Sequence, residues 1–93
     1  MPKPKSYPLN DYIKGIRILA AQKGFDRIEW ENKKGSVVRF EVFLKGENAP
    51  TDMWVVHTDH NHQREIWSRE DYKKAARILN ATLEEFIAIL EGI

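Results

Sequence analysis

The 93-residue sequence contains no cysteine, which excludes disulfide bonds and every metal site built on thiolates. It also lacks any run approaching the roughly 20 consecutive apolar residues that a transmembrane helix needs. Its first residues, MPKPKSYP, have no apolar segment of the signal-peptide kind. These absences predict a cytoplasmic protein with no membrane partner.

Charge of one sign is not in excess either, because 15 Lys and Arg residues face 14 Asp and Glu residues. The formal net charge of +1 does not indicate which kind of partner the protein binds. Only a local basic patch can do so. The apolar content is 42%, including three Trp, four Phe and three Tyr. That content is enough for one core, so we expect a single domain over residues 9–93. A flexible basic arm is expected at residues 1–8.

Two capping signals mark helices in the last third of the chain. Ser68 with Asp71 three residues later is a capping-box variant, and apolar residues recur behind it at helical spacing. Asn80 can end this basic helix in the left-handed conformation. Thr82 with Glu85 is a second capping box. This part is therefore predicted to be a helix, a tight corner and a short acidic helix.

One more helix and three strands are predicted before it. Residues 10–23 have helical apolar spacing, with Asn10 as the expected cap and Gly24 as the expected stop. Strand-like alternation follows in three segments, namely residues 25–31, 37–44 and 53–58. The order predicts an α+β fold, α-β-β-β-α with a short C-terminal helix. Its three-stranded antiparallel sheet should carry the helices on one face and leave the other face open.

The alternation also predicts which side chains are buried. The expected core contains Val38, Phe40, Val42, Trp54, Ile16, Leu79 and Phe86. The register that aligns the apolar faces of the last two strands makes three cross-strand pairs: Val42 with Val56, Glu41 with His57, and Arg39 with Asp59. Among the remaining aromatic residues, Trp30 and Trp67 are expected in the core. Phe43 is expected on the open face, where it can stack on a base or a partner side chain.

The order of these elements resembles the HicA-like toxins, small RNA-cleaving proteins of toxin–antitoxin pairs. The similarity covers roughly residues 9–90. It depends on LNDYIKGIRILAAQKGF as the first helix, KKGSVVRF as the turn and second strand, HNHQREI before the helix, and ARILNATLEEFIAIL as the ending. The resemblance implies a fold similar to the double-stranded-RNA-binding domain. It also implies double-stranded or structured RNA as a ligand and an antitoxin-type protein as a possible partner.

One departure from the HicA-like pattern falls on the reaction itself. The family has its catalytic histidine directly after the Gly-Ser of the second strand, whereas Gly35-Ser36 is followed here by Val37. Valine can neither take nor give a proton. The resemblance therefore implies a protein that is weak or inactive as a ribonuclease.

The segment HTDHNH offers the nearest replacement chemistry. His57, Asp59, His60 and His62 are three imidazoles and a carboxylate within six residues, a set that can bind zinc or supply an acid and a base. Because no second ligand cluster exists, we predict no metal and no cofactor. His57, oriented by Glu41, is the first candidate for the missing base, and His60 is the second. The alternatives are an ordinary cross-strand pair and a polar loop that faces water.

Basic residues suggest where RNA phosphates would bind. Eight are predicted to contact RNA, namely Lys33, Lys34, Arg39, Arg64, Arg69, Lys73, Lys74 and Arg77. A helix N-terminus beside lysines is a natural phosphate site. Similar KK-x-A helices in double-stranded-RNA-binding domains, which the chain resembles, contact phosphates across the groove. The alternative is a solvated helix face, made less basic by Glu65, Glu70 and Asp71.

Two functions of different classes follow from these patterns. The first is a HicA-like RNA-binding protein of a toxin–antitoxin-like system. The second is a non-enzymatic protein-interaction module that uses the open sheet face and its edge. Strong dependence of binding on salt favours the first, and salt-insensitive binding favours the second.

Overall fold

The computed structural model of the protein describes residues 6–59 and 64–93. Its helices are α1 (Leu9–Gln22), α2 (Arg69–Ile78) and α3 (Leu83–Glu91). Its strands are β1 (Tyr7–Pro8), β2 (Arg27–Lys34), β3 (Val37–Phe43), β4 (Asp52–His57) and β5 (Glu65–Ile66). No helix in the described part of the chain is both long enough and apolar enough to cross a membrane.

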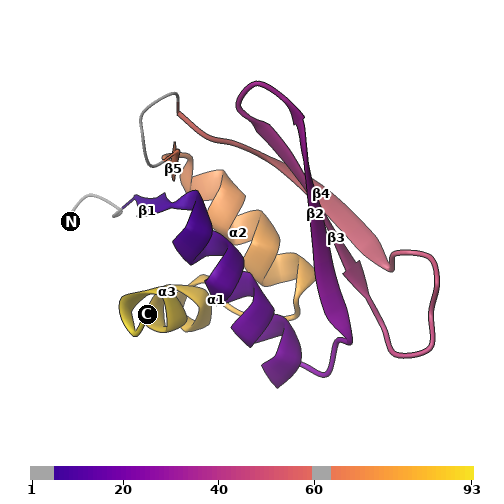
Figure 1. Cartoon of the computed structure of the whole chain (residues 1–93). Coiled ribbons are helices and arrows are strands. Elements are labelled where there is room, and N and C mark those ends of the chain that lie inside the picture. Colours follow the sequence, from indigo (N-terminus) through magenta and orange to yellow (C-terminus); the bar gives the residue numbers. More distant parts are fainter. Residues whose placement is uncertain (1–5, 60–63) are drawn as a thin grey trace.

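The predicted α+β fold is confirmed. Strands β2, β3 and β4 form an antiparallel sheet in that order, and the three helices lie on one side of it (Figure 1). All seven side chains predicted for the core are buried, with exposed fractions of 4% or less. Within residues 6–59 and 64–93, no helix covers the opposite face of the sheet.

The register predicted between β3 and β4 is wrong by four residues. Val42 lies opposite Asp52 instead of Val56, and His57 lies opposite Val37 instead of Glu41. A shift of an even number keeps every side chain on its predicted face, because side chains alternate with a period of two. The observed register pairs all six residues of β4 with β3, whereas the predicted one would extend the start of β4 beyond the end of β3. It also stacks Trp54 on Phe40, with ring centroids 5.3 Å apart.

The two predicted capping boxes have different outcomes. At α3 the Thr82 side chain accepts from the Glu85 backbone N–H and the Glu85 carboxylate accepts from the Thr82 N–H, as predicted. At α2 the N-cap residue Ser68 makes no side-chain bond. The Asp71 N–H donates to the Ser68 carbonyl at 3.0 Å instead of the Ser68 hydroxyl. The Asp71 carboxylate, which would complete the box, is turned toward the sheet and accepts from the backbone N–H of His57 at 3.4 Å. Asn80 ends α2 with φ of 61°, as expected.

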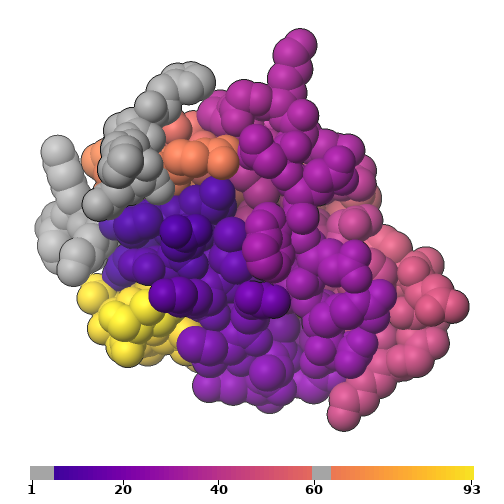
Figure 2. All heavy atoms as spheres, viewed as in Figure 1, coloured from indigo at the N-terminus to yellow at the C-terminus, as the bar shows by residue number. Residues whose placement is uncertain are grey.

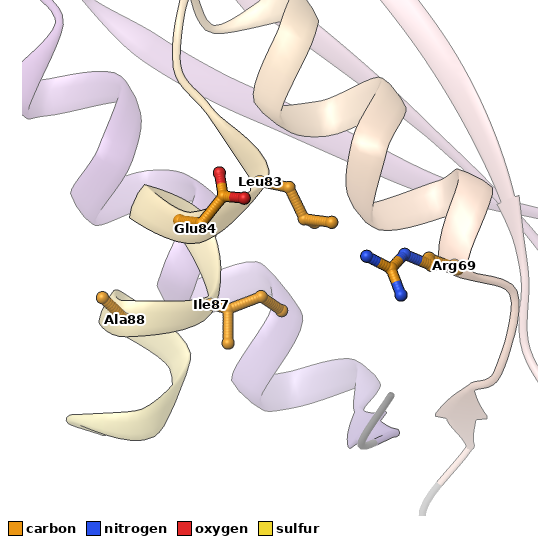
Figure 3. Close-up of a pocket in the computed structure, with 5 residues that line it drawn as sticks. All are labelled: Arg69, Leu83, Glu84, Ile87 and Ala88. Carbon is orange, nitrogen blue, oxygen red and sulfur yellow. The ribbon is translucent and has the colours of Figure 1, made fainter. Parts of the chain in front are cut away.

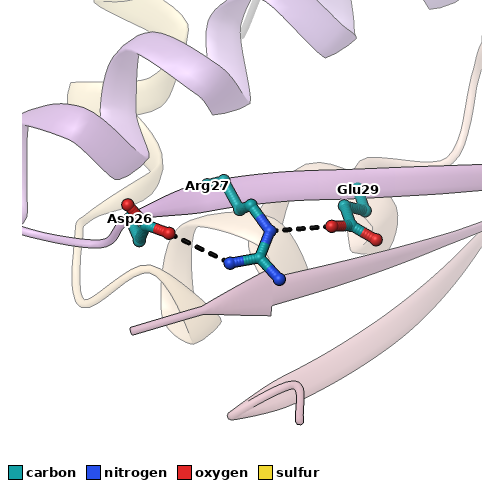
Figure 4. Close-up of polar contacts among 3 residues, drawn as sticks. All are labelled: Asp26, Arg27 and Glu29. Carbon is teal, nitrogen blue, oxygen red and sulfur yellow. Dashed lines mark hydrogen bonds and ion pairs between the residues drawn. The ribbon is translucent and has the colours of Figure 1, made fainter. Parts of the chain in front are cut away.

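Three aromatic residues differ from expectation. Trp30 and Trp67 are 42% and 62% exposed instead of buried, and Phe43 is only 4% exposed. The Arg27 guanidinium lies 3.9 Å from the centre of the Phe43 ring and is held there by Asp26 and Glu29 (Figure 4). The alternation of a strand gives the face of each side chain but not whether a neighbour covers it. Phe43 is therefore not available to stack on a base.

The expected N-terminal arm joins the fold by its last residues. Tyr7 and Pro8 pair with Ile66 and Glu65 as the short β1–β5 ladder, and the Tyr7 side chain is buried. Helix α1 then begins directly after Pro8, so Asn10 is not its cap. The Leu9 N–H donates instead to the Arg64 carbonyl at 3.1 Å. Residues 1–5 of the expected arm lie outside the described residues.

Candidate nucleic-acid interface

His57 ends strand β4 directly across from Val37, the position that the resemblance assigns to the catalytic base. The Thr58 N–H donates to the Ser36 carbonyl at 2.8 Å, so the pairing extends one residue further. Residue alternation puts the His57 side chain on the helix-free face of the sheet. The structure therefore brings His57 closer to position 37 than the predicted register did.

Glu41 cannot orient His57, which corrects its predicted role. Glu41 lies opposite Met53, and four strand positions separate Met53 from His57, about 13 Å at roughly 3.3 Å per residue. In the described part of the chain, the His57 ring has no hydrogen-bond or ion-pair partner. The other candidates, His60 and His62, lie outside the described residues. Among the described residues, no carboxylate contacts the exposed imidazole ring of His57.

Asp71 joins the start of α2 to the end of β4. Its side chain is 4% exposed and accepts from the His57 backbone N–H, and its Oδ1 lies 3.9 Å from the Lys74 ammonium. Burial, as the largest cause, raises the pKa of Asp71, while the His57 N–H and Lys74 act in the opposite direction. This contact holds the α2 N-terminus and Lys74 beside the sheet end that carries His57.

Arg64 makes a second long-range link at the same end of the sheet, between the segment before α2 and the end of β2. It has a left-handed backbone with φ of 55°, and its guanidinium donates to Asn32 Oδ1 at 2.6 Å and to the Gly35 carbonyl at 3.4 Å. Asn32 and Gly35 flank Lys33 and Lys34 at the end of β2, beside the β2–β3 turn, which projects from the molecule (Figures 1 and 2). Arg64 thus ties the segment before α2 to the end of β2 that carries these lysines. Nothing in the local sequence around Arg64 signalled that long-range bond.

The eight predicted RNA-binding residues do not form one surface. Four of them belong to segments that the Arg64 and Asp71 bonds join at this end of the sheet, and we call these the turn–helix surface: Lys33, Lys34, Arg64 and Lys74. Lys33 also lies 3.4 Å from Glu31, which approaches Arg39 at 3.6 Å on the helix-free face. On α2, Lys73 pairs with Glu70 at 3.6 Å, and Arg77 is exposed. Arg69 points to the opposite side, toward α3 (Figure 3).

Chemically, this arrangement suits phosphate binding better than catalysis. Cations from the end of β2, the segment before α2 and the second turn of α2 lie on segments joined there, and helix N-termini favour anions. Acid–base cleavage would need two positioned proton-transfer groups, whereas the described residues supply one unoriented histidine. No group of His, Cys, Asp or Glu within residues 6–59 and 64–93 has the geometry to hold a metal ion.

Comparisons of the chain with protein-family models, with curated proteins and with solved structures found no match.

Proposed function

We propose that this protein binds structured or double-stranded RNA as a HicA-like protein of a toxin–antitoxin-like system and cleaves it weakly or not at all. The observation that carries the proposal is that the bonds of Arg64 and Asp71 join the segments of Lys33, Lys34, Arg64 and Lys74 at the sheet end that carries His57 and Val37. It brings together two segments of the HicA-like resemblance that are far apart in the sequence. A cytoplasmic location and an antitoxin-type partner belong to the same proposal.

A preference for paired RNA follows from the spread of the cations over two elements. The end of β2 carries Lys33 and Lys34, and helix α2 carries Lys74 on its sheet side. Positive charge on a strand end and on a neighbouring helix fits phosphates of two strands across a groove, which is how double-stranded RNA is recognised by shape. Such contacts are independent of base sequence and weaken as salt rises.

Weak cleavage follows from the absence of an oriented base. A positioned acid or base typically contributes about 10²–10⁴-fold to such a reaction, and Val37 contributes nothing of this kind. His57 is directly across the ladder from Val37, but the residue proposed to orient it is distant. The His57 imidazole therefore lacks the oriented geometry that makes an efficient base.

The binding test compares two double variants that remove equal charge. Lys34→Ala with Lys74→Ala removes two cations from the turn–helix surface. Lys14→Ala with Lys45→Ala removes two exposed cations from α1 and the β3–β4 loop. Affinity for a fluorescent RNA duplex, measured across salt concentrations, should fall for the first pair, with the salt slope reduced by about 0.7–0.9 per lost contact. Equal effects of the two pairs would argue against this RNA-binding surface.

The cleavage test uses purified protein and bulk RNA, with and without divalent metal ions. We expect feeble cleavage that metal does not restore, and RNA binding that survives His57→Ala. Brisk cleavage that is abolished by His57→Ala would show that His57 on β4 is the catalytic residue and would contradict the proposal.

The variant Val37→His distinguishes a decayed ribonuclease from a scaffold kept for binding. A gain of cleavage would indicate a decayed ribonuclease whose remaining site is intact, and an inert variant would indicate a scaffold kept for binding.

The helix-free sheet face favours a protein-interaction module as the second candidate. Half-buried Val37 and Val55 share this face with Met53, which is 45% exposed. Phe43 does not contribute, because Arg27 covers it. Salt-insensitive capture of a protein partner, lost on Met53→Glu and Val55→Glu substitution, would support this function over RNA binding.

A further inference from the structure

Helix α3 carries more apolar surface than the core of one molecule uses. Six of its nine residues are apolar, namely Leu83, Phe86, Ile87, Ala88, Ile89 and Leu90. Phe86 and Leu90 are buried, Ala88 is exposed, and Leu83, Ile87 and Ile89 pack against the core by one side and keep part of their apolar surface exposed. A helix that is apolar on more than its core-facing side is normally covered on the other side as well. This excess is the first indication of a contact surface on α3.

A shallow groove of about 370 Å³ lies along the same part of α3. Its apolar floor consists of Leu83, Ile87 and Ala88. Figure 3 shows Arg69, from the start of α2, across the groove from Leu83 and Ile87, while Glu84 lies on the far side of them. The groove is therefore a strip with a cation at one end, apolar side chains in the middle and a carboxylate at the other end.

Neither end of the strip is neutralised within the described residues. Lys23, Lys73 and Lys74 form ion pairs with other acids, but Arg69 and Glu84 form none in the part of the chain that the structure describes. Glu85, the neighbour of Glu84, is occupied by the α3 capping box and by Lys23 at 2.8 Å. The two charges that flank the groove are thus available to a partner that carries the reverse order of charges.

We propose that a second copy of this chain occupies the groove, related to the first by a two-fold axis near Ile87. Such an axis sets Arg69 of one copy against Glu84 of the other, and does so twice. The apolar floors meet between the two ion pairs. A two-fold interface uses the same patch on both subunits and must be self-complementary, and the order cation–apolar–anion meets that condition. Ala88, with its small side chain, lets the two α3 helices approach closely.

A second copy explains the strip better than a partner of one charge. An acidic partner would satisfy Arg69 and repel Glu84, and a basic partner would do the reverse. The patch is small compared with the roughly 1,200–2,000 Å² of a stable interface. We therefore expect weak dimerisation, with a dissociation constant of about 10 µM to 1 mM. The proposal does not depend on RNA binding, because Arg69 lies away from the turn–helix surface.

Sedimentation equilibrium of the full chain tests the proposal over a range of protein concentrations. The wild type should show a monomer–dimer equilibrium, and Arg69→Glu or Glu84→Arg should each make the protein monomeric by setting like charges together. An equimolar mixture of these two variants should dimerise again. In the mixed dimer the introduced glutamate meets the introduced arginine at one contact, and the unchanged Arg69 and Glu84 meet at the other. Arg77→Glu, a reversal on the same helix as Arg69 but outside the groove, should leave the dimer unchanged.

Three results would overturn the proposal. One is a wild type that stays monomeric at 1 mM, the weak end of the expected range of about 10 µM to 1 mM. Another is a dimer that survives both single reversals, which would be formed by a different surface. The third is a mixture that stays monomeric although each variant keeps the wild-type circular dichroism spectrum. Rescue in the mixture is the decisive result, since a variant that merely misfolds cannot regain a dimer by meeting another.

Discussion

Phe40 is the central side chain of the core. It has no exposed surface, stacks on Trp54 and packs against Tyr12 with ring centroids 5.5 Å apart. Phe40→Ala should lower the free energy of unfolding by about 3–5 kcal/mol, the range for emptying an aromatic core site. Urea denaturation measures the loss. Ile18→Ala on the outer surface of α1 is the matched control, with an expected change within about 0.5 kcal/mol. A loss below about 1 kcal/mol for Phe40→Ala, on this scale, would contradict the observed packing.

Asp71 makes a different prediction, because its effect depends on pH. Burial raises its folded-state pKa above the ordinary value of 3.8, so the folded protein holds this proton more tightly than the unfolded chain. The stabilising contribution of the carboxyl is fully present below the unfolded pKa. It is lost as the pH rises through the folded pKa. Asp71→Asn removes the titration and keeps an oxygen that can accept from the His57 N–H.

The free energy of unfolding of Asp71→Asn, measured from about pH 3 to pH 7, should therefore change relative to the wild type. The difference between variant and wild type should move in favour of the variant as the pH rises above about 4. A constant difference over this interval would mean that Asp71 titrates alike in the folded and unfolded states. Such a result would mean that the His57 N–H and Lys74 offset the effect of burial on the pKa of this carboxyl.

At the scale of the element, the starts of α2 and α3 form a natural comparison. Both have a hydroxyl residue at the N-cap, but only Thr82 bonds the helix with its side chain. Thr82→Ala should cost about 0.5–2 kcal/mol of unfolding free energy, as loss of a side-chain cap does. Ser68→Ala should cost no more than about 0.5 kcal/mol. Thermal or urea unfolding of the two variants measures the contrast, and equal losses would contradict it.

The reason for this contrast lies outside the α2 sequence. The pattern S-R-E-D satisfies the requirements of a capping box locally, but Asp71 has a competing partner in the backbone of β4. Glu85 has no such competitor among strands, and its cap forms as predicted. A cap is thus predictable from sequence when its side chains point to water, and uncertain when one of them faces the core.

At the scale of the whole molecule, Tyr72 connects three segments that are far apart in the sequence. Its hydroxyl accepts from the Tyr7 N–H at 3.0 Å and donates to the Ile66 carbonyl at 2.6 Å, so it joins α2 to β1 and β5. Burial is the main reason that the pKa of Tyr72 rises to about 12. The hydroxyl therefore stays protonated, and remains a donor, at neutral pH.

Tyr72→Phe keeps the ring and removes both hydrogen bonds. The Tyr7 N–H and the Ile66 carbonyl would then lose a buried partner, which should lower the free energy of unfolding by about 1–3 kcal/mol. Hydrogen exchange should accelerate at the Tyr7 amide more than at amides of β3, because only the former loses its acceptor. Unchanged protection at Tyr7 would mean that another group holds the N-terminal segment in place.

The sequence by itself determined the order of the three helices and of the three strands of the main sheet, the faces of those strands and the cap of α3, but not the short β1–β5 ladder. These features depend on contacts between residues a few positions apart. They can be read directly from apolar residues that recur every two positions in a strand or every 3.6 positions in a helix. The same reasoning identified the seven core side chains, because the face of a strand or helix survives errors in pairing. The β3–β4 register was wrong by four residues and still left Phe40 and Trp54 buried.

Only the tertiary structure decided what lies against each of those faces. It exposed Trp67, buried Phe43 under Arg27, and moved His57 from Glu41 to Val37. The candidate site also depends on the tertiary structure. The sequence shows eight basic residues, but the long-range bonds of Arg64 and Asp71 determine which of their segments are joined. The register of β3 and β4, the covering of Phe43 and the joining of the basic segments all depend on residues far apart in the sequence. The local periodicity of the sequence does not contain this information.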